Sequence, residues 1–220
     1  MIMNEIPIFP LPNLVFFPKT FLPLHIFEDR YRRMVEDAHT SEHLIGMVLL
    51  KDDWEKDYFG VPAVHDIACV GKIQQMEKLH DGKYNIMLYG MSRVRILKFV
   101  QVKPYRIAQV KVLKEINFDY DGFDETYETE SFIGLLRRYF QEIGVEQLDE
   151  LLKLRTRSLE AIINQIVSIF DFSTQEKQDM LEIDSLERRY EQARMLIEDR
   201  LVSMKIARTV KIVPENPSWN

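Results

Sequence analysis

The stretch 6–31, IPIFPLPNLVFFPKTFLPLHIFEDRY, decides the fold because it combines a heavy apolar load with five prolines between positions 7 and 23. Each proline fixes φ and lacks the N–H that a β-ladder requires. We therefore expect short extended pieces at 6–9 and 15–17 in place of long regular strands. The apolar residues between the prolines predict that this irregular backbone is buried against a sheet.

The apolar pattern changes near residue 120. Before it, apolar residues tend to alternate, as in strands, and after it they recur every three or four residues, as in helices. We expect six or so mostly antiparallel strands with one embedded helix at about 28–39, and helices at 125–143, at 158–170 and from about 186. The predicted class is α+β, with a β-rich part at 1–118, a helical bundle at 119–210 and a flexible tail at 211–220.

A hairpin is predicted inside the β-rich part. Asp81-Gly82 separates two alternating runs, 67–79 and 83–89, and an Asp-Gly pair in this position is a strong hairpin signal. A further strand is expected at 93–100.

Two helix starts carry capping signals. Ser173 with Glu176 has the spacing of a capping box, and Asp184 with Glu187 repeats it with aspartate as the cap. The segment 147–154 is expected to form a short turn or helix.

Charge and cysteine content limit the class of partner and the compartment. The 220 residues have a formal net charge of -6, which gives no general attraction to nucleic acid or to anionic membranes. The single cysteine, Cys69, has no partner for an intrachain disulfide. The amino-terminal apolar residues are broken by prolines and lack a basic start, so no signal peptide is predicted. We expect a cytoplasmic protein.

The motifs of common enzymes fail in detail. Gly-Lys pairs at 71–72 and 82–83 lack the earlier glycine and the following Ser or Thr of a phosphate-binding loop. The segment 90–92 lacks the last glycine of a hydrolase elbow, since position 94 is Val. Cys69 lies in an apolar alternating run and is expected to be buried and inert. No catalytic residue and no cofactor are predicted.

Metal sites are also not expected. His39 and His43 are four residues apart but straddle a predicted helix end, and no Glu follows His39. The acidic run 119–130 departs from the calcium-loop ligand order after Asp121-Gly122. We interpret the histidines as solvated loop residues and the acidic run as a helix amino terminus.

The chain resembles the Lon N-terminal domain in four blocks that occur in the same order. These blocks are FPL at 9–11 with VFFP at 15–18 and LPLHIFE at 22–28; VGKI at 70–73, DG at 81–82 and YG at 89–90 with RVRI at 93–96; PY at 104–105; and KQ at 177–178, LE at 181–182 and ER at 187–188. The first block, with Tyr31 after it, is more similar to free-standing Lon-domain proteins than to full proteases.

The resemblance implies a fold and a function. The implied fold is a PUA-like β pseudo-barrel followed by a helical bundle. In full Lon proteases this domain helps to recognise and hold protein substrates, and the ATPase and protease domains follow it. The resemblance therefore implies a non-catalytic binding module for unfolded or degron-bearing polypeptides, or one that acts with a protease or chaperone partner.

Most of the stretch 6–31 is expected to build the core, and only a minority to face a partner. Expected packing residues are Phe9, Leu14, Phe16, Leu24 and Phe27. The predicted peptide-binding residues are His25, Phe27, Glu28, Tyr31 and Arg32. Glu28 is also expected to pair with Arg93 or Arg95 and so to fix the helix to the sheet.

The alternative hypothesis is RNA binding, because PUA-like folds include RNA-binding proteins. The net charge disfavours it, and the candidate basic patch consists of Arg93, Arg95, Lys98, Lys103 and Arg106. An unrecognised enzyme is the third hypothesis, although no nucleophile, base and orienting group occur together in the sequence.

Overall fold

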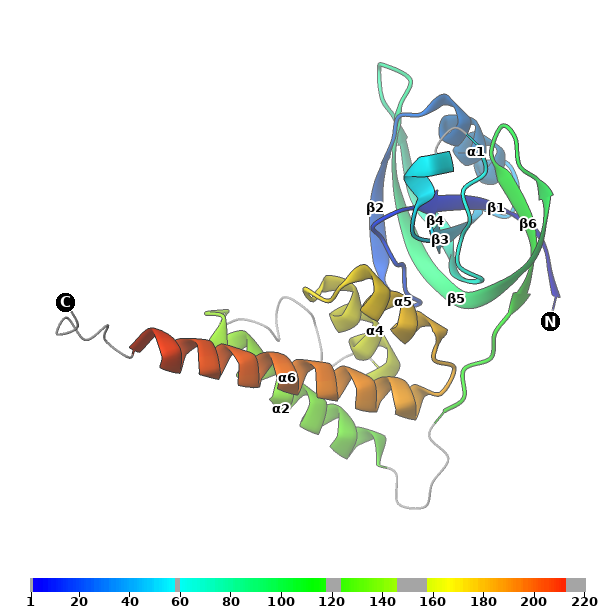
Figure 1. The fold of residues 1–220 in the computed structure, drawn as a ribbon. Coiled ribbons are helices and arrows are strands. Elements are labelled where there is room, and N and C mark those ends of the chain that lie inside the picture. The colour runs from blue at the N-terminus through cyan, green and yellow to red at the C-terminus, as the bar shows by residue number, and fades with distance from the viewer. Residues whose placement is uncertain (1, 58–59, 118–123, 146–157, 213–220) are drawn as a thin grey trace, which may run out of the picture.

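The computed structural model describes residues 2–57, 60–117, 124–145 and 158–212 (Figure 1). A ring-like sheet forms one end of the molecule and a group of helices the other, and the last helix extends away from the sheet. The α+β class is thus confirmed. The predicted boundary between 118 and 119 lies outside the described residues, as do residues 213–220 of the predicted tail.

Six strands form the sheet in the order β2-β5-β4-β3-β1-β6. Pairing of β5 with β6 closes the ring, and the pairing of β1 with β3 is parallel while the other pairings are antiparallel. The mostly antiparallel pseudo-barrel implied by the family resemblance is confirmed. The strands are β1 (Ile2–Leu11), β2 (Phe21–Ile26), β3 (Leu44–Leu49), β4 (Ile67–Lys78), β5 (Tyr84–Gln101) and β6 (Arg106–Val112).

The prolines do not prevent a long first strand, so that prediction was wrong. β1 pairs with β6 over residues 2–8 and with β3 over residues 8–11, so each half is bonded mainly on one side. Pro7 and Pro10 have no N–H, and on the unpaired side of each half of β1 no N–H is needed for a ladder hydrogen bond. Pro23 lies in β2, which pairs with β5 alone and is an edge strand. The second extended piece expected, at 15–17, forms no strand.

β5 is a single strand where two were predicted. It runs through Gly90, whose N–H donates to Thr20 O at 2.9 Å and whose carbonyl accepts from Lys19 N at 2.8 Å. A side chain at Gly90 would overlap the carbonyl oxygen of Phe17. The glycine thus allows the chain before β2 to cross β5 at close range, and it does not end the strand.

The predicted hairpin joins β4 to β5. Gly82 has φ of +80°, a conformation that glycine adopts without steric cost. Leu79 N donates to Lys83 O at 2.8 Å and closes the turn. The Asp-Gly signal therefore identified the turn correctly.

The embedded helix α1 (Asp29–His39) buries the stripe Tyr31, Met34, Val35 and Ala38. Phe27, an expected packing residue, precedes the helix and is 60% exposed. A 3-10 turn, η1 (Trp54–Asp57), lies between β3 and β4.

The remaining helices are α2 (Glu125–Glu142), α4 (Leu159–Ile169), α5 (Thr174–Glu182) and α6 (Leu186–Ile212). Ser173 and Glu176 form the predicted capping box of α5. α6 starts where it was predicted, but its predicted cap was wrong by one residue, because Ser185 Oγ accepts from Arg188 N at 3.3 Å and Asp184 is not the cap. The segment predicted at 147–154 lies outside the described residues.

Sheet and helices share one core. The larger buried cluster runs from α1 through one face of the strands to α2, α4 and α6, and a smaller cluster lies on the other face. Polar contacts join the parts as well: Asn164 Nδ2 donates to Pro18 O at 3.1 Å, and Gln178 Nε2 donates to Ile67 O at 3.1 Å. The helices are therefore fixed to the barrel by buried side chains.

Candidate functional site

A cavity of about 320 Å³ opens beside the start of α1. It is framed by the ends of β1 and β2, the first turn of α1, the segment around η1 and the β5–β6 connection. Most of its lining side chains are apolar or aromatic, and four can carry a charge. The lining residues are Phe9, Pro10, Leu11, Pro12, Leu24, His25, Phe27, Glu28, Arg30, Tyr31, Leu50, Trp54, Gly60, Pro62, Val102, Pro104, Tyr105 and Arg106.

Two aromatic rings of the cavity lining pack against each other in a tilted arrangement. The Phe9 and Tyr31 ring centroids are 4.1 Å apart, and both residues are buried. The Arg30 guanidinium lies over the Tyr31 ring, 4.5 Å from its centroid. Such ring pairs and cation–π contacts fix side chains in place. The Tyr31 ring is thus held by contacts with both Phe9 and Arg30.

Two charged residues of the cavity lining, Glu28 and Arg30, form an ion pair with each other. Arg30 donates from Nε to Glu28 Oε2 at 2.9 Å, and its Nη2 is also 2.9 Å from that oxygen. The expected pairing of Glu28 with Arg93 or Arg95 was wrong. Arg93 lies at the junction with the helices, where its Nε is 3.5 Å from Glu115 Oε2 and its Nη1 donates to Leu181 O at 3.2 Å.

Four of the five predicted binding residues line this cavity. They are His25, Phe27, Glu28 and Tyr31, whereas Arg32 points elsewhere and donates to Asp29 Oδ1 at 2.6 Å. Phe27 had also been expected to pack in the core, but its exposure corrects that expectation. Its ring lies 6.3 Å from the His25 ring in a stacked arrangement.

Sequence reasoning missed the lining residues that come from distant segments. Trp54, Val102 and Tyr105 reach the cavity only because the barrel closes. Tyr105 donates its hydroxyl to Asp37 Oδ2 at 2.6 Å, and burial together with this carboxylate raises its pKa to about 12. The Pro-Tyr pair at 104–105 is one block of the family resemblance, but no local sequence pattern places it near Phe27.

Both strand edges beside the cavity carry a proline. The outer edge of β2 contains Pro23, and the part of β1 that pairs only with β3 contains Pro10. A proline removes the backbone donor that an added strand would need. Contacts in the cavity must therefore come chiefly from side chains.

The basic patch of the RNA hypothesis does not assemble as predicted. Arg93 and Arg106 are buried, with 2% and 7% of their surface exposed. Arg106 lies 5.6 Å from the Phe99 ring centroid. Only Arg95, Lys98 and Lys103 of the five predicted residues are exposed.

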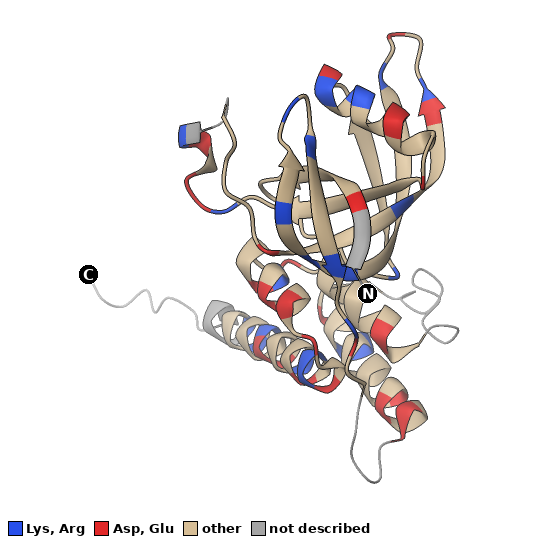
Figure 2. Cartoon of the chain, turned by 90° about the vertical axis from the view of Figure 1, so that its right-hand side faces the viewer, with Lys and Arg blue, Asp and Glu red and all other residues tan. Residues whose placement is uncertain are grey.

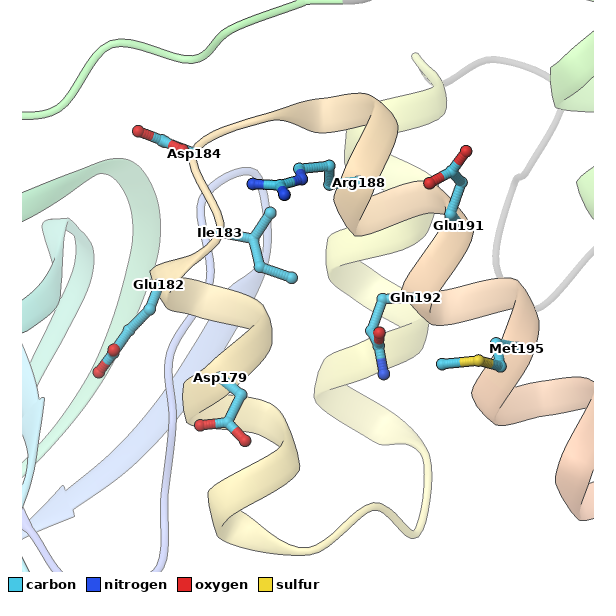
Figure 3. A pocket seen from close by; sticks show the side chains of 8 residues that line it. All are labelled: Asp179, Glu182, Ile183, Asp184, Arg188, Glu191, Gln192 and Met195. Atoms are coloured by element: carbon cyan, nitrogen blue, oxygen red, sulfur yellow. The ribbon is translucent and has the colours of Figure 1, made fainter.

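A second hollow of about 640 Å³ lies between α5 and α6 (Figure 3). Asp179, Glu182, Asp184 and Glu191 supply four carboxylates to its lining, against one guanidinium from Arg188. In Figure 3 the carboxylates of Asp179 and Glu182 project from α5, while Glu191 projects from α6. Ile183 and Met195 are its only apolar lining residues. This acidic surface is poorly suited to an apolar chain, unlike the cavity beside α1.

The candidate reactive groups lie in ordinary settings. Cys69 is fully buried in β4, and burial raises the pKa of its thiol. The His39 and His43 rings are 4.9 Å apart. In the described ranges, no three or more His, Cys, Asp or Glu side chains gather as a metal would require. The described helices include none that is long and apolar enough to cross a bilayer.

Comparison with solved structures agrees with the fold. The N-terminal domain of the Mycobacterium avium complex Lon protease matches with a TM-score of 0.65 and 16% identity, covering 89% of this chain and 99% of that one. The Lon N-terminal domain protein from Xanthomonas campestris matches with a TM-score of 0.59 and 21% identity, covering 86% and 96%.

Comparison with curated proteins finds Lon proteases. That of Anaeromyxobacter dehalogenans is 26% identical over 211 residues, which is 93% of this chain and 24% of the relative. That of Dictyoglomus thermophilum is 26% identical over 216 residues, 96% of this chain and 26% of the relative. The chain therefore spans about a quarter of the length of these relatives. Residues 5–199 match the family described as the ATP-dependent protease La (LON) substrate-binding domain, and the chain belongs to that family.

Proposed function

We propose that this protein is a non-catalytic polypeptide-binding module whose cavity beside α1 holds apolar segments of unfolded or degron-bearing chains. The observation that carries the proposal is the exposed Phe27 ring at an aromatic cavity of about 320 Å³. An exposed apolar surface beside a concave apolar pocket is typical of a binding site. The printed description of the family, a substrate-binding domain, supports the same function.

Binding in the cavity depends on inserted side chains. Burial of one large apolar side chain contributes about 1.5–3 kcal/mol, so a single insertion gives weak and reversible binding. The prolines of both neighbouring edges disfavour strand addition, which would otherwise add main-chain hydrogen bonds irrespective of sequence. The module thus selects segments by their apolar side chains, as expected for a protein that distinguishes unfolded from folded chains.

Held clients are passed to a separate protease or chaperone partner in the cytoplasm. The family match covers the substrate-binding domain, and the site described above contains no nucleophile with an adjacent base. Burial of Cys69 and its raised thiol pKa keep that residue from reacting.

The test compares two phenylalanines of similar exposure. Phe27, at the cavity, is 60% exposed, and Phe21, at the other end of β2, is 58% exposed. We expect Phe27→Ser to weaken binding of fluorescently labelled casein by roughly fivefold, about 1 kcal/mol. Phe21→Ser should leave the affinity unchanged. Fluorescence anisotropy measures both constants.

A second variant fills the cavity. Leu24→Trp places a larger side chain in the lining and should compete with the client for space. Equal casein affinity of wild type, Phe27→Ser and Leu24→Trp would overturn the proposal, provided that all three give the same circular dichroism spectrum. Absence of any casein binding by the wild type would also overturn it.

A further inference from the structure

One segment of this acidic protein is strongly basic. Residues 83–114 contain eight Lys and Arg residues and no Asp or Glu, whereas the whole chain has 29 Lys and Arg against 35 Asp and Glu. The segment comprises β5, the β5–β6 connection and β6. The charge asymmetry therefore belongs to one ribbon of the barrel.

The exposed cations of the ribbon lie on its outer surface. Arg95, Lys98, Lys103 and Lys111 are exposed. Figure 2 views the barrel from the side of β6 in Figure 1, and blue segments predominate on the strands nearest the viewer. We name the outward surface formed by Arg95, Leu97, Lys98, Val100 and Lys111 the ribbon face.

Two of these cations face each other across the strands. Arg95 of β5 and Lys111 of β6 are directly opposed in the antiparallel register. Like charges in this arrangement destabilise a sheet. Within the described ranges neither residue forms an ion pair with a carboxylate, and the nearby Glu5 accepts a hydrogen bond from Gln109 at 3.4 Å. The fold thus retains a repulsion that it does not compensate internally.

The apolar residues of the ribbon face indicate the class of ligand. Leu97 is 47% exposed and Val100 is 41% exposed, between the cationic positions. The aromatic residues beside the ribbon face are not exposed, because Phe99 is half-buried beside Arg106 and Tyr105 is buried. Single-stranded nucleic acid binding relies on exposed aromatic rings that stack on bases. Cations separated by aliphatic residues instead complement a polypeptide that carries both carboxylates and aliphatic side chains.

We propose that the ribbon face docks an acidic, amphipathic polypeptide segment, and that its carboxylates relieve the repulsion between Arg95 and Lys111. The proposal concerns a surface separate from the cavity and does not depend on the function assigned to the cavity. Pairing of exposed charges contributes modestly and is screened by salt, so binding is salt-sensitive.

The probe is a synthetic fluorescent peptide of alternating Glu and Leu, compared with a Lys and Leu peptide of equal length and with an oligouridylate RNA. The Glu peptide should bind, and the affinity should fall with added salt. Lys111→Glu should weaken this binding roughly tenfold, which corresponds to about 1.4 kcal/mol. Lys72→Glu, at an exposed lysine of β4, is the matched control and should have little effect.

Stability of the free protein gives an independent readout. Lys111→Glu replaces a repulsive cross-strand pair by an attractive one, so the melting temperature should rise while peptide affinity falls. No Glu-peptide binding, an equal loss in Lys72→Glu, or tighter binding of the RNA would each overturn the proposal.

Discussion

Arg189 of α6, which has no exposed surface, donates from Nη2 to Glu115 Oε1 at 2.7 Å. The same carboxylate lies 3.5 Å from Arg93 of β5. Burial raises the pKa of Glu115, although both guanidinium groups favour the ionised form. One carboxylate in the segment after β6 thus joins the barrel to the last helix.

Removal of the Glu115 carboxylate should destabilise the junction between the barrel and α6. Glu115→Gln removes the carboxylate that is ion-paired with two buried guanidinium groups, and breaking a buried pair costs about 3–5 kcal/mol. Urea unfolding should show a loss of this order. Asp29→Asn, which removes the exposed partner of Arg32, should change stability by less than about 1 kcal/mol. Similar effects of the two substitutions would contradict this account.

Substitution by alanine should change stability in opposite directions at two glycines. At Gly90 a Cβ would overlap the Phe17 carbonyl, so Gly90→Ala should cost about 3 kcal/mol through forced backbone movement. At Gly134, inside α2, nothing lies within 4 Å of the added atom, and Gly134→Ala should stabilise by about 1 kcal/mol. Melting temperatures of the two variants test the contrast, and a fall in both would refute the reasoning for α2.

The ordinary pKa of a tyrosine is about 10, and in the folded state those of Tyr105 and Tyr190 are raised to about 12, by burial and by hydrogen bonds to Asp37 and Glu128. Between these two pH values the unfolded chain loses the phenolic protons and the folded chain keeps them. Folding stability should therefore be complete below pH 10 and fall as pH rises toward 12. Tyr105→Phe should reduce the decline, as measured by urea midpoints across this range. An unchanged pH dependence would show that Tyr105 titrates normally.

Two residues, Ser185 and Asp184, are possible caps of α6, and alanine substitution separates them. Ser185→Ala removes the oxygen that accepts from Arg188 N and should cost about 1 kcal/mol. Asp184→Ala should cost less, because its side chain is not the cap. The reverse order of stabilities would restore the assignment made from sequence.

Features set by neighbouring residues were predictable from the sequence. The Asp81-Gly82 turn, the Ser173–Glu176 box and the change of apolar period each depend on a few adjacent side chains, and the structure shows all three. The family resemblance supplied the pseudo-barrel, which periodicity alone did not specify.

Features set by distant partners were not predictable in the same way. Pro7 is compatible with β1 because each half of that strand is paired mainly on one side, and Gly90 continues β5 because Phe17 crosses it. Arg93 was predicted in a basic surface patch, but it is buried and donates to Leu181 O of α5. For the candidate site, local sequence indicated His25 to Tyr31, and closure of the barrel supplied Trp54 and Tyr105.

The prolines of the two open strand edges also bear on the proposed binding of unfolded chains. An unprotected edge is a template on which unfolded chains stack into aggregates. Pro10 and Pro23 interrupt that template beside the cavity where apolar segments would be concentrated. A holder of unfolded chains built in this way avoids becoming the seed of a fibril.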